Sequence, residues 1–134
     1  MGKIIPKIHF IFISYIIFSF VTPTFALTKK NTKQAQIYRD EGYKAQRSGN
    51  LDMALSYYQR AIEINSDYAT VYNDIGVILE AKGDSKKAKE AYLKAISLDS
   101  KLLSAYYNLA ALYEKDQDYA KAASYWRIRV QLGD

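Results

Sequence analysis

The same kinds of residue recur every 34 positions along this chain. Tyrosine stands at residues 38, 72 and 106, and a small residue follows each tyrosine by four positions. The full pattern is Tyr38, Tyr72 and Tyr106; Gly42, Gly76 and Ala110; Ala54, Ala88 and Ala122; and Tyr58, Tyr92 and Trp126. A fixed period of this length is typical of repeat architectures, in which each unit buries its apolar face by stacking on its neighbours.

Within one period the spacings are those of two helices. Tyr72 and Gly76 are four residues apart, and so are Ala88 and Tyr92, so each pair lies on one face of a helix. Small residues are needed where two helix backbones approach closely, and large aromatic side chains fill the space beside them. The pattern therefore predicts antiparallel helix pairs that stack on one another.

Turn signals fall between the expected helices. Ser48-Gly49-Asn50 and Lys82-Gly83-Asp84 each offer a glycine to end one helix and a polar residue to cap the next. Lys115-Asp116-Gln117-Asp118 occupies the third such position without a glycine. We expect helices near residues 33–48, 51–64, 68–82, 85–98, 102–115 and 119–132.

The period and its phased Tyr/Gly and Ala/Tyr/Ala positions resemble those of the tetratricopeptide repeat family. The resemblance covers residues 35–134, as repeats 35–68, 69–102 and 103–134, and implies an all-α fold, a right-handed superhelical array of three helix-turn-helix repeats. Repeat one departs from the pattern at Glu41, where an apolar residue is usual. A related 35-residue helical repeat reads RNA, but the 34-residue phase favours the protein-binding family.

Charge also argues against a nucleic-acid partner. The net charge is +5, yet residues 35–134 contain 14 basic and 14 acidic residues. The excess comes from Lys3, Lys7, Lys29, Lys30 and Lys33. A repeat region without net positive charge lacks the general basic excess that phosphate binding uses.

Catalysis is not expected of the repeat region. The chain has no cysteine, and its one histidine, His9, precedes the repeats. The commonest general base, nucleophile and metal ligands are therefore missing from residues 35–134. No glycine-rich phosphate loop occurs, and the glycines are explained by turns and close packing. We expect no enzyme activity, no metal site and no cofactor.

Residues 1–26 have the layout of a secretory signal peptide. Lys3 and Lys7 precede a 13-residue apolar stretch, His9 to Val21, and small residues at Thr24 and Ala26 offer a cleavage site. A membrane-spanning helix needs about 20 apolar residues. We therefore expect cleavage after Ala26, a basic linker at 27–34, and a periplasmic or secreted protein. The alternative is an uncleaved anchor that holds the repeats outside the cytoplasm.

The resemblance also implies where a partner would bind, because in this family the first helix of each pair lines a concave groove that takes a peptide or a helix. Carried onto this sequence, the groove residues are Arg39, Tyr43, Arg47, Asn73, Asp74, Val77, Tyr107, Asn108 and Ala111. The same face would carry Gln36, Asp40, Thr70, Glu80, Ser104 and Glu114. Paired asparagine amides suit a peptide backbone, and tyrosines supply contact area. The competing interpretation is that these residues form only the solvated faces of helices.

One branch of the family grips the C-terminal carboxylate of chaperones with lysine, arginine and asparagine. Here Asp74 occupies the central position, and Ser104 and Asn108 stand where the third repeat would supply cations. An aspartate at the centre would repel a carboxylate, so this ligand is disfavoured.

The last expected helix carries an apolar surface that no later repeat in the sequence covers. We expect Trp126, Ile128 and Val130 to mark a self-association or docking site, with Trp126 and Val130 also packing within the repeat. A homodimer through the C-terminal repeat, docking on a larger partner and a truncated chain all fit this pattern.

Two functions of different kinds remain. The first is a non-catalytic exported adaptor or scaffold that binds a peptide or helix of a partner protein in its groove. The second is a membrane-anchored assembly factor for a larger complex.

Mass spectrometry of the mature N-terminus distinguishes the two. We expect the chain isolated from its native cells to begin at Leu27, because the small residues at 24 and 26 fit signal peptidase. A chain that begins at Met1 would show that the leader is retained.

Overall fold

The computed structural model describes residues 32–133. The predicted signal peptide at 1–26 and most of the predicted linker at 27–34 lie outside the described residues.

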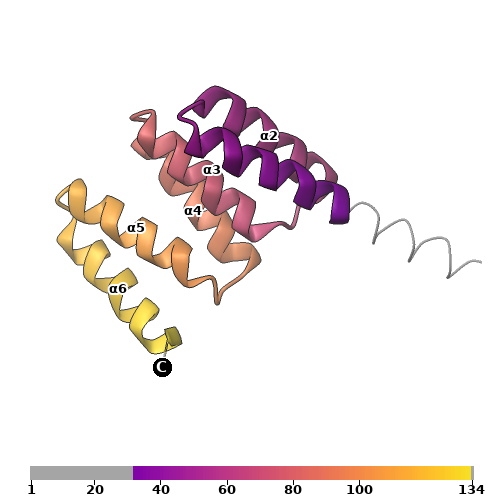
Figure 1. The fold of residues 1–134 in the computed structure, drawn as a ribbon. Helices are drawn as coiled ribbons and strands as arrows, with labels where there is room; N and C mark the ends of the chain where they lie inside the picture. The colour runs from indigo at the N-terminus through magenta and orange to yellow at the C-terminus, as the bar shows by residue number, and fades with distance from the viewer. Residues whose placement is uncertain (1–31, 134) are drawn as a thin grey trace, which may run out of the picture.

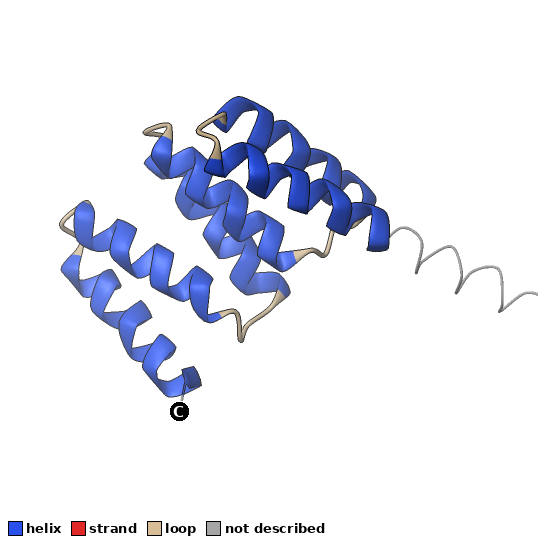
Figure 2. Cartoon of the chain, in the orientation of Figure 1, coloured by secondary structure: helices blue, strands red, loops and turns tan. Residues whose placement is uncertain are grey.

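The described residues form helices and no strand, as expected (Figure 2). A first helix, described here from 32 to 47, precedes five more. These are α2 (Leu51–Ile64), α3 (Ala69–Ala81), α4 (Ser85–Leu98), α5 (Leu103–Lys115) and α6 (Tyr119–Gly133). All six lie within one or two residues of the ranges expected from the sequence.

The helices stack in chain order, so the colour runs across the molecule from one end to the other (Figure 1). Within pairs, α3 packs on α4 and α5 packs on α6. Between pairs, α2 packs on α3, α4 packs on α5, and α3 also contacts α5. The first helix pairs with α2, where the rings of Tyr38 and Tyr57 stack with centroids 6.4 Å apart.

The turns within the first two pairs follow the predicted chemistry. Gly49 and Gly83 adopt φ values of 81° and 84°, the left-handed region that glycine enters without strain. Asn50 then caps α2 by accepting a hydrogen bond from the Met53 amide at 3.1 Å. In the same way, Asp84 caps α4 by accepting from the Lys87 amide at 3.1 Å.

The third turn reaches the same geometry without a glycine. Gln117 adopts a φ of 62°, and Asp118 accepts a hydrogen bond from the Lys121 amide at 3.2 Å. The prediction that this segment ends one helix and caps the next is confirmed.

In each of the first two pairs, a tyrosine ring of the second helix packs closely against a glycine of the first helix. Tyr58 and Tyr92 are fully buried. A Cβ added at Gly42 would lie 2.6 Å from Cδ1 of Tyr58, and a Cβ at Gly76 would lie 2.6 Å from Cδ1 of Tyr92. Each ring therefore occupies the space that any larger residue at the glycine would need.

The hydroxyls of these tyrosines are satisfied in the same repeating way. Tyr58 donates to Oε1 of Gln46 at 2.7 Å, and Tyr92 donates to Oε2 of Glu80 at 3.2 Å. The two acceptors are themselves 34 residues apart, so the repeat preserves the hydrogen bond as well as the packing.

The core is divided between successive junctions. One cluster joins α2 to α3 through Ala61, Val71, Ile75 and Ile78. A second joins α4 to α5 through Ala88, Tyr92, Leu109 and Leu112. Each of these clusters thus extends from one pair into the next, as expected of a stacked repeat.

Among residues 32–133, no helix has the length and apolar character that crossing a bilayer requires.

Replacing Gly76 with alanine should destabilise the protein by about 1–3 kcal/mol, because the new methyl group collides with the Tyr92 ring. The penalty should appear even though alanine is about 1 kcal/mol better than glycine inside a helix. Urea unfolding followed by circular dichroism measures the difference.

The same substitution in a Tyr92→Leu background is the matched control. Once the ring is gone, Gly76→Ala should be neutral or stabilising. An equal penalty in both backgrounds would show that the ring is not the cause.

Candidate functional site

The nine predicted groove residues lie on the first helix, α3 and α5, and we call the side of the stack that carries them the groove face. Their exposure differs widely. Tyr43, Arg47 and Tyr107 are exposed, whereas Asn73 is only 6% exposed. Arg39, Asp74, Val77, Asn108 and Ala111 are half-buried. The structure therefore does not present them as one uniformly accessible strip.

Two side-chain hydrogen bonds link consecutive pairs across this face. Nε of Arg39 donates to Oδ2 of Asp74 at 2.7 Å. Nδ2 of Asn108 donates to Oδ1 of Asn73 at 2.9 Å. Both contacts join residues 35 apart, from one pair to the next. We call these two contacts the rungs.

The Arg39–Asp74 rung is charged and only partly accessible to water. The side chains are 30% and 16% exposed. Burial alone would lower the pKa of Arg39, but the hydrogen bond and charge of Asp74 raise it above its ordinary value. Burial raises the pKa of Asp74, and the hydrogen bond and charge of Arg39 oppose that rise. Arg39 is thus already paired with an anion of its own chain.

The second rung changes the role expected of the two asparagines. Asn73 is buried, and its amide oxygen accepts from Asn108. Asn73 therefore joins the repeats together in this structure, and only Asn108 of the pair is partly open to solvent.

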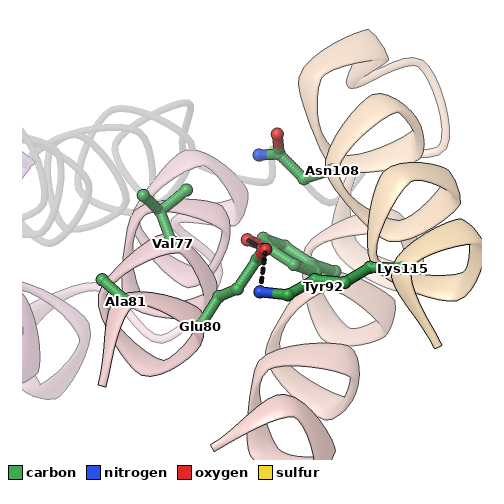
Figure 3. A pocket seen from close by; sticks show the side chains of 6 residues that line it. All are labelled: Val77, Glu80, Ala81, Tyr92, Asn108 and Lys115. Atoms are coloured by element: carbon green, nitrogen blue, oxygen red, sulfur yellow. Dashed lines mark hydrogen bonds and ion pairs between the residues drawn. The ribbon is translucent and has the colours of Figure 1, made fainter. Parts of the chain in front are cut away.

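A hollow of about 460 Å³ opens on the groove face between α3 and α5. Val77, Glu80 and Ala81 line it from α3, and Asn108 and Lys115 line it from α5 (Figure 3). Tyr92 of α4 contributes its ring. Of the nine predicted residues, the hollow brings together Val77 and Asn108.

Glu80 contacts both Lys115 and Tyr92 in the hollow. Its Oε1 lies 3.7 Å from Nζ of Lys115, and its Oε2 accepts from the Tyr92 hydroxyl (Figure 3). Burial raises the pKa of Tyr92, and the charge of Glu80 raises it further, so the phenol remains a hydrogen-bond donor. The exposed ion pair with Lys115 is weak and easily rearranged.

These groups suit recognition of a polypeptide. Val77 and Ala81 offer apolar contact, Asn108 has both an amide donor and an acceptor, and Glu80 and Lys115 carry opposite charges. Among the described residues, no group of three or more His, Cys, Asp or Glu side chains is placed to hold a metal ion.

Sequence reasoning missed Ala81, Tyr92 and Lys115 as lining residues. A signal for two of them was present, because Ala81 and Lys115 stand 34 and 68 residues after Arg47, which the resemblance had assigned to the groove. The helical spacing predicts Tyr92 to be in the core, where its ring does lie, but no sequence pattern indicates that it also lines the hollow.

The remaining predicted groove residues lie elsewhere on this face. Tyr43 and Arg47 are on the first helix, away from the hollow. Tyr107 meets Trp126 edge to face, with ring centroids 5.1 Å apart, and the guanidinium of Arg129 lies 5.6 Å from the centroid of its ring. Tyr107 therefore belongs with α6 rather than with the hollow.

The three residues predicted for self-association lie on α6. Trp126 is half-buried against Tyr107, as expected of packing within the repeat. Ile128 and Val130 are exposed. The expectation that Val130 packs within its repeat is wrong, because the side chain is 55% exposed. Its equivalents Ile62 and Ile96 pack on the apolar clusters at the junctions with following pairs.

Comparison with known proteins agrees with this architecture. A family model described as tetratricopeptide repeat matches residues 33–101. No curated protein matches the chain.

Solved structures of repeat proteins superpose well. A crystal structure of MamA has a TM-score of 0.72 and 28% identity, over 76% of this chain and 60% of that chain. The Arabidopsis OM64 TPR domain has a TM-score of 0.72 and 24% identity, over 76% of this chain and 84% of that one. The second TPR of Spaghetti (RPAP3), bound to HSP90 peptide SRMEEVD, has a TM-score of 0.72 and 18% identity, over 77% and 95%. The chain thus spans about three fifths of MamA, and the last two likenesses show the fold alone.

Replacing Asn108 with alanine should lower the free energy of unfolding by about 1–3 kcal/mol, because the buried amide oxygen of Asn73 loses its donor. Urea unfolding measures the change. Ser104→Ala, at an exposed position of the same helix, is the control and should stay within about 0.5 kcal/mol of the parent. If the two variants are equally stable, the rung does not hold the repeats together.

Proposed function

The chain belongs to the tetratricopeptide repeat family, and we propose that it is a non-catalytic adaptor that binds a peptide or helix of a partner protein on its groove face. The observation that supports this most directly is the hollow between α3 and α5, where an apolar wall meets an amide and a pair of opposite charges. A groove with these groups can take side chains in its apolar part and pair with backbone amides beside them.

We propose further that the adaptor works outside the cytoplasm. The support is the layout of residues 1–26, which lie outside the described residues. If the leader is retained, the same groove face would serve a membrane-anchored assembly factor.

The chemistry of the groove face argues against an acidic C-terminal peptide as the ligand. The solved TPR of Spaghetti (RPAP3) is bound to the HSP90 peptide SRMEEVD. Arg39 is the one cation here at the positions with which one branch of the family grips a carboxylate, and it is already paired with Asp74 at 2.7 Å. A carboxylate would have to displace Asp74 and then sit beside it. The partner is therefore a segment of mixed polarity rather than one that ends in several acids.

A random peptide library displayed on phage tests the proposal with the full chain as bait. Ala81→Arg places a long charged side chain at the exposed rim of the hollow, so selected peptides should bind this variant at least about tenfold more weakly. Ala120→Arg adds the same side chain at an exposed site on α6 and should leave binding unchanged.

Fluorescence anisotropy of the selected peptides, with SRMEEVD as a reference, gives the affinities. If the selected peptides bind both arginine variants with the same affinity as the parent, the binding site lies outside the hollow. Tight binding of SRMEEVD that is lost in Arg39→Ala would overturn the argument against acidic ligands.

A further inference from the structure

The outer face of the last pair exposes positions that are buried in the earlier pairs. Ala61 and Ala95 are fully buried, and the residue 34 positions further on is Arg129, which is half-buried. Asn73 is 6% exposed, and its equivalent Tyr107 is 50% exposed. In the earlier pairs, Ala61 shares an apolar cluster with Val71 of the following pair, and Asn73 accepts a hydrogen bond from Asn108 of the following pair.

The outer face of the first helix shows the complementary pattern. Ile37 is 45% exposed, whereas its equivalents Val71 and Ala105 are fully buried, and Val71 shares an apolar cluster with Ala61 of the pair before it. Glu41 occupies the position of Ile75 and Leu109, which are buried. The outer face of the α5–α6 pair and the outer face of the first helix therefore carry the two surfaces that meet wherever one pair packs on the next within the described residues.

We propose that a second copy of this chain stacks head to tail on the first, with the first helix of one copy packed on the α5–α6 face of the other. At the internal junction, Ala61 belongs to the same apolar cluster as Val71 and Ile75. In the third pair, the position of Ala61 is occupied by Arg129. In the first pair of the next copy, the positions of Val71 and Ile75 are occupied by Ile37 and Glu41.

Charge complementarity is what selects a second copy as the occupant. The two ends depart from the apolar pattern at matching positions, with a cation at 129 and an anion at 41, so the junction gains an ion pair where the internal ones have apolar contact. Nε of Arg129 is buried with no hydrogen-bond partner in the described structure, and it gains one from an arriving carboxylate. Glu41 now meets Lys44 at 2.6 Å, an exposed pair of low strength that yields readily.

The rungs give an independent match. They join Arg39 to Asp74 and Asn73 to Asn108, always from one pair to a position 35 residues later. Tyr107 is the equivalent of Arg39 and Asn73, and Asp40 is the equivalent of Asp74 and Asn108. One repeat further on, the same contact would therefore join Tyr107 to the residue at the Asp40 position of a following pair. Asp40 is an exposed carboxylate and the Tyr107 hydroxyl can donate to it, so Tyr107 of one copy and Asp40 of the next complete a third rung.

The end face also has room for the arriving helix. A hollow of about 270 Å³ lies beside Arg129, lined by Leu103, Val130 and Gly133. Its apolar walls accept a side chain such as Ile37. Because this contact uses different surfaces on the two copies, it leaves both outer ends free and builds open chains rather than closed dimers.

Disulfide trapping tests the arrangement, because the native chain has no cysteine. The full-length Ile37→Cys and Val130→Cys variants carry tags of different mass. Cell extracts that contain them are mixed without denaturant and oxidised mildly. Both positions keep Arg129 and Glu41 intact, and their equivalents Val71 and Ile62 lie in, or pack on, the same apolar cluster at the internal junction. The expected product is the mixed 37–130 disulfide. Glu90→Cys, at an exposed site on α4, is paired with Val130→Cys as the control and should not cross-link.

The outcomes separate the candidate occupants. A disulfide between two copies of Val130→Cys without the mixed product shows a symmetric dimer through α6 and overturns the proposal. Cross-linking between positions 37 and 130 that is no greater than that of the Glu90 control also overturns the proposal. The α5–α6 face would then bind another protein or none.

Charge reversal then tests the ion pair in the same assay. Arg129→Glu in the Val130→Cys chain should reduce the mixed disulfide about tenfold. Glu41→Arg in the Ile37→Cys chain should restore it. A yield unaffected by Arg129→Glu, or a loss that Glu41→Arg does not restore, rules out the pairing that selected the second copy.

Discussion

The close fit of a tyrosine ring against a glycine backbone is the constraint on which the first two helix pairs depend. Tyr58 over Gly42 and Tyr92 over Gly76 fix how near the two helices of a pair approach. That distance places the small residues Ala54 and Ala88 in the interior and turns the tyrosine hydroxyls toward Gln46 and Glu80. The fit thus reaches the groove face, because Tyr92 and Glu80 line its hollow. The third pair has Ala110 and Trp126 at these positions, and its tryptophan turns to Tyr107 instead.

Features that depend on one pair at a time could be predicted from the sequence. The glycine turns, the caps at Asn50 and Asp84, and even the turn through Gln117 follow from the local preferences of those residues. The buried tyrosines follow from helical spacing and the 34-residue period. These interactions are short in sequence, so the pattern of residues determines them.

Features that join one pair to the next were not predictable in the same way. The Asn73–Asn108 contact spans 35 residues and depends on how the pairs are rotated on stacking, which no local pattern encodes. The same holds for the ion pair that Lys115 makes with Glu80 of another pair, although the repeat period does place Lys115 on the groove face. Val130 was misplaced for a related reason, since its equivalents Ile62 and Ile96 pack on apolar clusters that join their pair to the following one. Sequence periodicity identifies equivalent positions, but their contacts change when a neighbouring pair is absent from the described residues.

The two rungs have different physical natures, so they respond differently to salt and to pH. The Arg39–Asp74 rung is ionic and partly exposed, so dissolved salt weakens it and protonation of the carboxylate removes one of its charges. The Asn73–Asn108 rung is neutral, and neither salt nor pH alters its charge. In an array where each unit contacts mainly its neighbours, stability is a sum of such junctions. Ion pairs also join the second and third pairs, Lys89 to Asp116 and Glu80 to Lys115, so rising salt loosens both junctions through their charged contacts. The neutral Asn73–Asn108 rung is the polar contact that persists, and it holds the second and third pairs together when the ion pairs are screened.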